Sequence, residues 1–204
     1  RDIAASASRA PVHALIDSGA LITGLENDEV AHILLQLLPA WYRGVVFLDR
    51  RDRQMILLRD SMRAVLLAQS GVAPEARFTF YDHSHTTGVD IRQAPNACAV
   101  LTLGKDMVFR DYAQGAYRMR GIGRGQTVRL YVTAEVEKLM AQELGPLAAG
   151  RVELDVPAWL LVSSMRQEAL QYVKLASQEL HNIARKRALQ ELLEEVRQNA
   201  PSSS

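Results

Sequence analysis

Apolar runs alternate with helix-forming stretches along the first two thirds of the chain. Six largely apolar runs predict strands, which lie within residues 11–22, 43–49, 55–58, 77–82, 97–103 and 127–132. The segments between them predict helices at residues 26–38, 61–69, 106–120 and 134–144. Strands that alternate with helices are typical of βαβ units. We therefore expect an α/β fold of three layers, in which helices cover both faces of a mostly parallel sheet.

The pattern changes near Gly145 and Pro146. From Ala158 to Ala200 the chain has neither glycine nor proline, and apolar residues recur every three or four positions. This spacing predicts one or two long amphipathic helices. The expected organisation is thus an α/β domain over residues 11–145, a helical extension over 146–200 and a disordered tail over 201–204.

Composition narrows the class of protein. Of the 204 residues, 48% are hydrophobic and 23% are charged, which is ordinary for a globular protein. The net charge of +1 excludes a histone-like polycation, and no apolar stretch is long enough to predict a membrane span. The single cysteine, Cys98, excludes an internal disulfide, and we expect it to be a buried, inert thiol in a reducing compartment, cytoplasmic or nuclear. Because the chain begins with Arg1 rather than methionine, we interpret it as a piece of a larger protein.

Three segments at the carboxyl ends of predicted strands carry polar groups that suit a ligand. The loop over residues 82–91 contains Gly88, which permits a close backbone approach, and the acidic residue Asp90. In the predicted helix that follows, Gln114 and Arg118 lie four residues apart and should share a face. A glycine-rich turn then carries Arg124.

Positive charge is concentrated in the same region. Residues 105–129 contain six basic and two acidic residues, a net charge of +4 in a chain whose total is +1. Guanidinium groups match the geometry of phosphate oxygens, so this cluster suits a polyphosphate.

The order of these motifs resembles motifs V and VI in the second RecA-like lobe of superfamily 2 helicases. Gly88 and Asp90 match motif V, whereas Gln114 and Arg118 match motif VI. The second motif VI arginine would usually stand at Gly121, and its neighbours Arg120 and Arg124 are the candidates here.

The chain is also similar to the helicase-like portion of a family of very large eukaryotic proteins of unknown function, which often carry the label ubiquitinyl hydrolase. Those proteins share a His-Thr-x-Gly-x-Asp loop, a Thr-Leu-Gly strand end and a Met-Arg-Met-Arg-like helix. The resemblance covers residues 12–132, most of the predicted sheet domain.

The resemblance implies an ATPase role. Arg118, together with Arg120 or Arg124, would act as an arginine finger on ATP that is bound to the first lobe. Gln114 would position the phosphates, while Gly88 and Asp90 would couple the cleft to a bound partner such as nucleic acid. The sequence contains no Gly-x-x-x-x-Gly-Lys-Ser/Thr loop and no Asp-Glu-x-His/Asp box. ATP and Mg²⁺ are therefore expected only together with a first lobe, and the isolated chain is expected to be inactive.

Other interpretations stay open at this level. The chain could be a helicase-derived interaction or scaffold module in a large assembly, or, more weakly, part of a ubiquitin-processing protein. Arg118, Arg120 and Arg124 could simply form ion pairs with Asp106, with Asp111 and with carboxylates of the long helices. His83 and His85, with Asp82 or Asp90, have a spacing compatible with zinc or iron, but histidines in polar loops more often bond to backbone, so no metal is expected.

Overall fold

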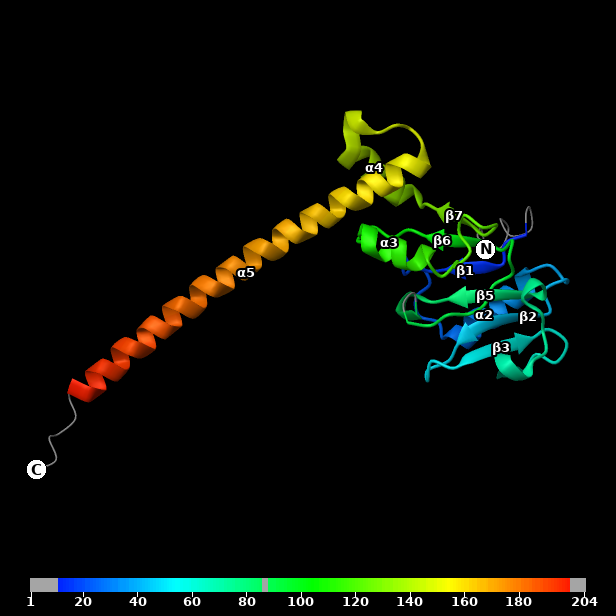
Figure 1. Cartoon of the computed structure of the whole chain (residues 1–204), viewed down its shortest axis with the longest axis horizontal. Helices are drawn as coiled ribbons and strands as arrows, with labels where there is room; N and C mark the ends of the chain where they lie inside the picture. Colours follow the sequence, from blue (N-terminus) through cyan, green and yellow to red (C-terminus); the bar gives the residue numbers. More distant parts are fainter. Residues whose placement is uncertain (1–10, 86–87, 199–204) are drawn as a thin grey trace, which may run out of the picture. The chain divides into compact units, whose positions relative to one another are not determined.

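Seven strands form one mixed sheet in the computed structural model, which describes residues 11–85 and 88–198. The strand order is β4-β3-β2-β5-β1-β6-β7 (Figure 1). The strands are β1 (Ala14–Ile16), β2 (Gly44–Leu48), β3 (Gln54–Leu58), β4 (Ala64–Leu66), β5 (Arg77–Tyr81), β6 (Cys98–Thr102) and β7 (Thr127–Tyr131). The five strands β2, β5, β1, β6 and β7 pair in parallel with their neighbours. Strand β3 pairs antiparallel with both β2 and β4, which gives the sheet an antiparallel edge. The expected mostly parallel sheet is confirmed.

Helices cover both faces of this sheet. The chain passes from β1 through α2 (Asn27–Leu37) to β2, and from β6 through α3 (Phe109–Ala116) to β7 on the other side of β1. Right-handed crossovers that run in opposite directions place their helices on opposite faces. The packing agrees, because Val100 of β6 belongs to the α2 core whereas its neighbour Leu101 contacts Gly115 of α3. The arrangement is the expected three-layer α/β fold and is consistent with a RecA-like domain.

The main core lies between α2 and the strands. Apolar side chains of α2 pack on alternate residues of β1, β2 and β5, including Leu15, Val45 and Phe80. All five residues of β2, β5 and β6 are buried, as expected for strands that are covered on both faces. Burying a side chain such as Phe80 stabilises the fold by about 2–3 kcal/mol. This core fixes the strand ends from which the polar loops emerge.

The segment predicted as a helix at residues 61–69 is instead an edge strand followed by a short 3₁₀ turn, so this prediction was wrong. Residues 64–66 form β4, and Leu67–Gln69 form the 3₁₀ turn. A tight turn in which Met62 has φ 53° brings β4 back onto β3, where Leu66 pairs with Met55. The ladder with β3 supplies the backbone hydrogen bonds that a short helix would have made within itself.

The helix predicted at residues 106–120 is shorter than expected. It begins at Phe109 and ends at Ala116, and the backbone N–H of Val108 donates to the Asp111 carboxylate at its start. The residues that follow form turns, in which the N–H of Arg118 donates to the Gly115 carbonyl. The arginines after Ala116 therefore project from a turn rather than from a helix face.

Two helices complete the chain. α4 (Ala134–Leu144) begins at Thr133, whose hydroxyl accepts a hydrogen bond from the N–H of Val136. α5 (Val152–Gln198) is one helix of 47 residues, where one or two were expected. By its contacts the chain divides into a first unit that ends at Leu161 and a second that begins at Val162, and each is described by itself.

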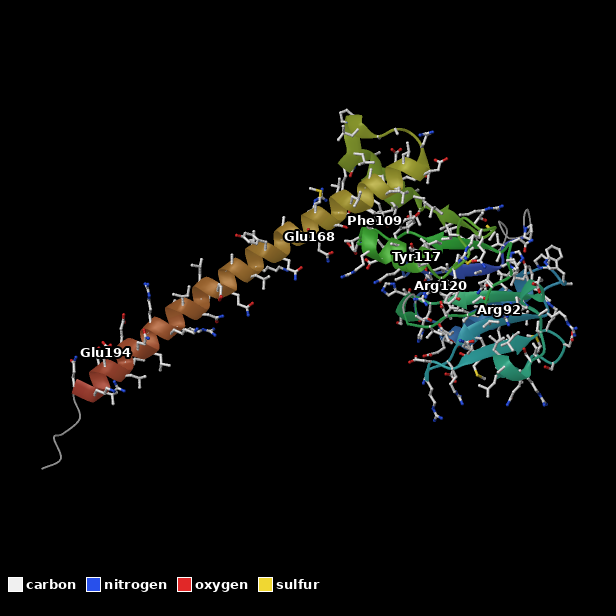
Figure 2. All side chains as sticks on the ribbon, in the orientation of Figure 1. Arg92, Phe109, Tyr117, Arg120, Glu168 and Glu194 are labelled. Atoms are coloured by element: carbon white, nitrogen blue, oxygen red, sulfur yellow. The ribbon has the colours of Figure 1, made fainter. Side chains whose placement is uncertain are left out.

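The two units differ in burial along α5. Its first turns bury Val156, Trp159 and Leu160 in the first unit. In the second unit the apolar side chains beyond Val162 are exposed, and Figure 2 shows Glu168 and Glu194 directed away from the helix axis. Within the described part of the chain, no helix combines the length and the apolar character that a membrane crossing requires. The tail predicted at residues 201–204 lies outside the described residues.

Candidate functional site

A cavity of about 320 Å³ lies where the loop after β5 meets the turn after α3. The lining consists of residues 90–93, of two arginines in the turn after α3 and of the residue directly before β7. These residues are Asp90, Ile91, Arg92, Gln93, Arg118, Arg120 and Gln126. Three guanidinium groups face one carboxylate, so the lining carries a net positive charge. We call it the arginine cavity.

Arg118 forms the inner wall of the arginine cavity. Its side chain is only 7% exposed, and it donates a hydrogen bond to the backbone carbonyl of Val89. A nitrogen of the same guanidinium lies 3.7 Å from a carboxylate oxygen of Asp90. Arg118 thus ties the turn after α3 to the loop after β5.

Arg120 lies at the rim. Its Nε donates to both carboxylate oxygens of Asp90, at 2.9 and 3.0 Å, while more than half of its side chain remains exposed. Hydrogen bonding to Asp90, and then the charge of Asp90, raise the pKa of Arg120. Figure 2 shows Arg120 in the turn that follows Tyr117.

Gln126 holds the glycine-rich turn in place. Its side-chain oxygen accepts from the N–H of Gly121 at 2.7 Å, and its amide nitrogen donates to the carbonyl of Ala94 at 2.8 Å. Within the turn, Gly125 has φ 113°, and a Cβ there would lie 2.8 Å from the carbonyl oxygen of Pro95. Glycine is therefore required at this position.

The guanidinium of Arg124 is attached to the same turn. It is exposed and donates to the backbone carbonyl of Arg120 at 3.2 Å. Arg124 is not part of the cavity lining, but this hydrogen bond attaches its guanidinium to the backbone of Arg120, which does line the cavity.

The floor behind the cavity is a buried polar network. Gln93 exchanges hydrogen bonds with the hydroxyl of Thr79, and the hydroxyl of Tyr81 donates to the carbonyl of Ile91. Burial raises the pKa of Tyr81, so this group stays protonated and can act as a donor. The network fixes residues 91–93 against β5.

The structure brings together some of the sequence-predicted residues and separates others. Asp90, Arg118 and Arg120 meet in the cavity, and Arg124 adjoins it. Gly88 precedes them with φ 88°, a conformation that favours glycine. Gln114 is exposed on α3 and does not line the cavity, because the helix ends before Arg118 and the expected shared face is lost.

Sequence reasoning missed three lining residues, Arg92, Gln93 and Gln126. Arg92 stands two positions after Asp90, and this alternation within an extended loop was the available signal. Gln126 follows a run of alternating glycines, where a residue that closes the turn is needed. Neither signal is specific without knowledge of which strands lie side by side.

The two loop histidines have different partners. Residues 83–85 form a 3₁₀ turn, in which His83 Nδ1 lies 3.1 Å from the carbonyl oxygen of Ser18 and His85 lies between Asp82 and Asp52. Among the residues that the structure describes, no group of three or more His, Cys, Asp or Glu side chains is arranged to hold a metal ion. Cys98 is buried in β6.

Ion pairs with Asp106 and Asp111 were one expectation for the arginines of this region, but the acidic partner of Arg118 and Arg120 is Asp90. Asp90 pairs with Arg118 and Arg120, and Asp111 lies 3.7 Å from Arg110. Asp90 thus neutralises part of the positive charge of the arginine cavity. The charge that remains on its exposed guanidinium groups suits the binding of an anion. Comparison of the chain with protein-family models, curated proteins and solved structures finds no match, so the motif resemblance to helicases stays a hypothesis.

Proposed function

We propose that this chain is the second, arginine-finger lobe of a helicase-like P-loop ATPase. One observation supports the proposal above the others: the loop that resembles motif V and the segment that resembles motif VI meet at a single positively charged cavity. They come from different parts of the sheet, and an ATPase lobe needs both at one edge. The α/β fold with its mostly parallel sheet is compatible with that role.

Within this proposal the arginines have different tasks. Arg120 and Arg124 are exposed and are the groups that reach phosphate oxygens on a facing lobe. Arg118 is buried and holds the loop that carries Asp90. ATP and Mg²⁺ would be held by a first lobe that provides the phosphate-binding loop, and an arginine finger there stabilises charge on the transferred phosphoryl group.

A second candidate, a non-catalytic interaction module, is favoured by a separate observation. The described part of α5 beyond Leu161 exposes a series of apolar side chains, including Met165, Val173, Leu180 and Ile183. Such a helix suits contact with other proteins of a large assembly. In this case the arginine cavity would only stabilise the fold.

ATP hydrolysis by a protein that contains both lobes separates the two candidates. If the chain is an arginine-finger lobe, the double substitution Arg120→Ala and Arg124→Ala lowers the turnover roughly 10³-fold or more, as is typical of arginine fingers. Arg110→Ala is the matched control, because Arg110 is an exposed arginine of α3 outside the cavity. Equal turnover in the double variant and the control would favour the scaffold, and hydrolysis by the isolated chain would contradict the proposed division of labour.

A further inference from the structure

His85 bridges two acidic residues from different parts of the fold. Its Nδ1 lies 2.5 Å from a carboxylate oxygen of Asp82, and its Nε2 lies 2.8 Å from a carboxylate oxygen of Asp52. Asp82 follows β5, whereas Asp52 belongs to the turn at residues 49–53, here called the hairpin turn, between β2 and β3. The imidazole therefore joins the end of β5 to the tip of a neighbouring hairpin.

Both contacts together require the charged ring. An ionised carboxylate only accepts hydrogen bonds, and a neutral imidazole has a single N–H to donate. Only the imidazolium can donate to Asp82 and Asp52 at the same time. Burial lowers the pKa of His85, but hydrogen bonds to Asp52 and Asp82 and the charges of both carboxylates raise it more, and the net pKa lies above its ordinary value.

The two contacts of His85 are unequal. Asp82 is mostly buried and also accepts a hydrogen bond from the side-chain amide of Asn27 at 3.0 Å, so it is held from two sides. Asp52 is 73% exposed and sits in the hairpin turn with φ 57°, which is an unfavourable backbone conformation for aspartate. On loss of the proton, we therefore expect the remaining N–H to stay with Asp82 and the contact to Asp52 to be lost.

The hairpin also supports the arginine cavity. The side-chain amide of Gln54, the first residue of β3, donates to the backbone carbonyl of Asp90 at 3.0 Å. Asp90 in turn holds Arg120. Gln54 lies two positions after Asp52, so this hydrogen bond joins the hairpin to a wall of the cavity.

We propose that His85 is a proton-operated latch: its imidazolium fastens the hairpin turn to the end of β5, and its deprotonation releases the turn and loosens the support of Asp90. The latch concerns conformation, and it holds whether or not the arginine cavity meets ATP.

Other charged side chains lie on the same side of the fold as His85, and some of them form ion pairs with one another. They line the larger cavity of about 860 Å³ on this side of the fold and are Glu26, Asp28, Glu29, Asp49, Arg50, Arg51 and Arg53. Arg53 pairs with Asp49 at 2.7 Å, and Arg50 pairs with Glu26 at 2.7 Å. The carboxylates in hydrogen-bond contact with the imidazole are Asp82 and Asp52.

The test uses the 204-residue chain and two observables across pH 5–9. Imidazole resonances in NMR spectra give the midpoint of His85, and hydrogen exchange, corrected for the intrinsic pH dependence of amides, gives the protection of the hairpin turn. We expect a midpoint above 6.5 and a loss of protection of roughly fivefold as the pH rises through it, the effect of one hydrogen bond.

Asp52→Asn is the decisive variant, because asparagine tolerates the left-handed backbone at this position and the fold is preserved. It should lower the midpoint of His85 and make the protection of the turn independent of pH. Asp60→Asn is the matched control, since Asp60 is an exposed carboxylate that pairs with Arg43 rather than with His85. Equal midpoints in the two variants, or a wild-type midpoint at or below 6.5, would overturn the latch.

Discussion

Asp90 accepts hydrogen bonds from the Nε of Arg120 with both of its carboxylate oxygens, at 2.9 and 3.0 Å. This contact joins the loop after β5 to the turn after α3 at the rim of the arginine cavity. It also occupies the guanidinium that the proposed function assigns to a phosphate. Any anion that enters the cavity must compete with Asp90 for Arg120.

Asp90→Asn should therefore strengthen anion binding. The substitution removes one negative charge from the lining and frees Arg120, so the affinity for inorganic tripolyphosphate, measured by calorimetry, is expected to rise several-fold. Asp106→Asn is the control, because Asp106 is also an exposed acidic residue but lines a different cavity. The same gain in both variants would indicate a general charge effect and would contradict a specific competition at Arg120.

Arg118 and Arg120 should differ in their importance for stability. Arg118 is buried and donates to the Val89 carbonyl, so Arg118→Ala is expected to lower the free energy of unfolding by about 2 kcal/mol. Arg120 is exposed, and Arg120→Ala should change that free energy much less. Urea denaturation of the two variants gives the comparison, and a larger loss for Arg120→Ala would show that the two roles are reversed.

Gly19 and Gly104 test the close approach of the loops after β1 and β6. A Cβ on Gly19 would lie 2.6 Å from the backbone nitrogen of Gly104, where backbone has to move to make room. Gly19→Ala is therefore expected to cost about 3 kcal/mol of stability. At Gly24 the space is open and only the left-handed backbone opposes a side chain, so Gly24→Ala should cost about 1 kcal/mol. Thermal unfolding measures both, and equal losses would contradict the close packing at Gly19.

His13 should make stability depend on pH in the sense opposite to His85. Burial lowers the pKa of His13, whose Nδ1 accepts a hydrogen bond from the N–H of Cys98 at 3.3 Å and is therefore unprotonated. As the pH falls, His13 becomes protonated in the unfolded chain before it does so in the folded chain. The contribution of His13 to stability is therefore complete above about pH 6.5 and decreases as the pH falls toward the folded-state pKa. For His85 the folded-state pKa is raised, and its contribution is complete below 6.5 and is lost as the pH rises.

Urea denaturation at pH 5.5 and 7.5 separates the two histidines. Relative to the wild type, His13→Gln should lose less stability at pH 5.5 than at pH 7.5, and His85→Gln should lose more at pH 5.5 than at pH 7.5. Parallel losses at both pH values in either variant would show that the histidine concerned keeps the same protonation state in the folded and unfolded chains.

The sequence determined the class of fold because the local pattern of apolar residues indicates which faces of each element are buried. Runs such as residues 44–48, apolar at every position, fit only strands that are covered on both faces, and the repeat of three or four along residues 27–37 fits only a helix with one buried side. Their alternation then implied parallel strands with helices on both faces. The same reasoning failed at residues 64–66, where a short apolar stretch is compatible with either element and pairing with β3 decides.

The tertiary structure decided the composition of the site. From the sequence, Arg118 and Gln114 were expected to act together, yet the end of α3 at Ala116 sends Arg118 inward and leaves Gln114 in solvent. The bridge from Asp52 through His85 to Asp82 and the bond from Gln54 to Asp90 join residues that lie far apart in the sequence. Such contacts depend on which strand ends lie side by side, and no local pattern of residues encodes that order.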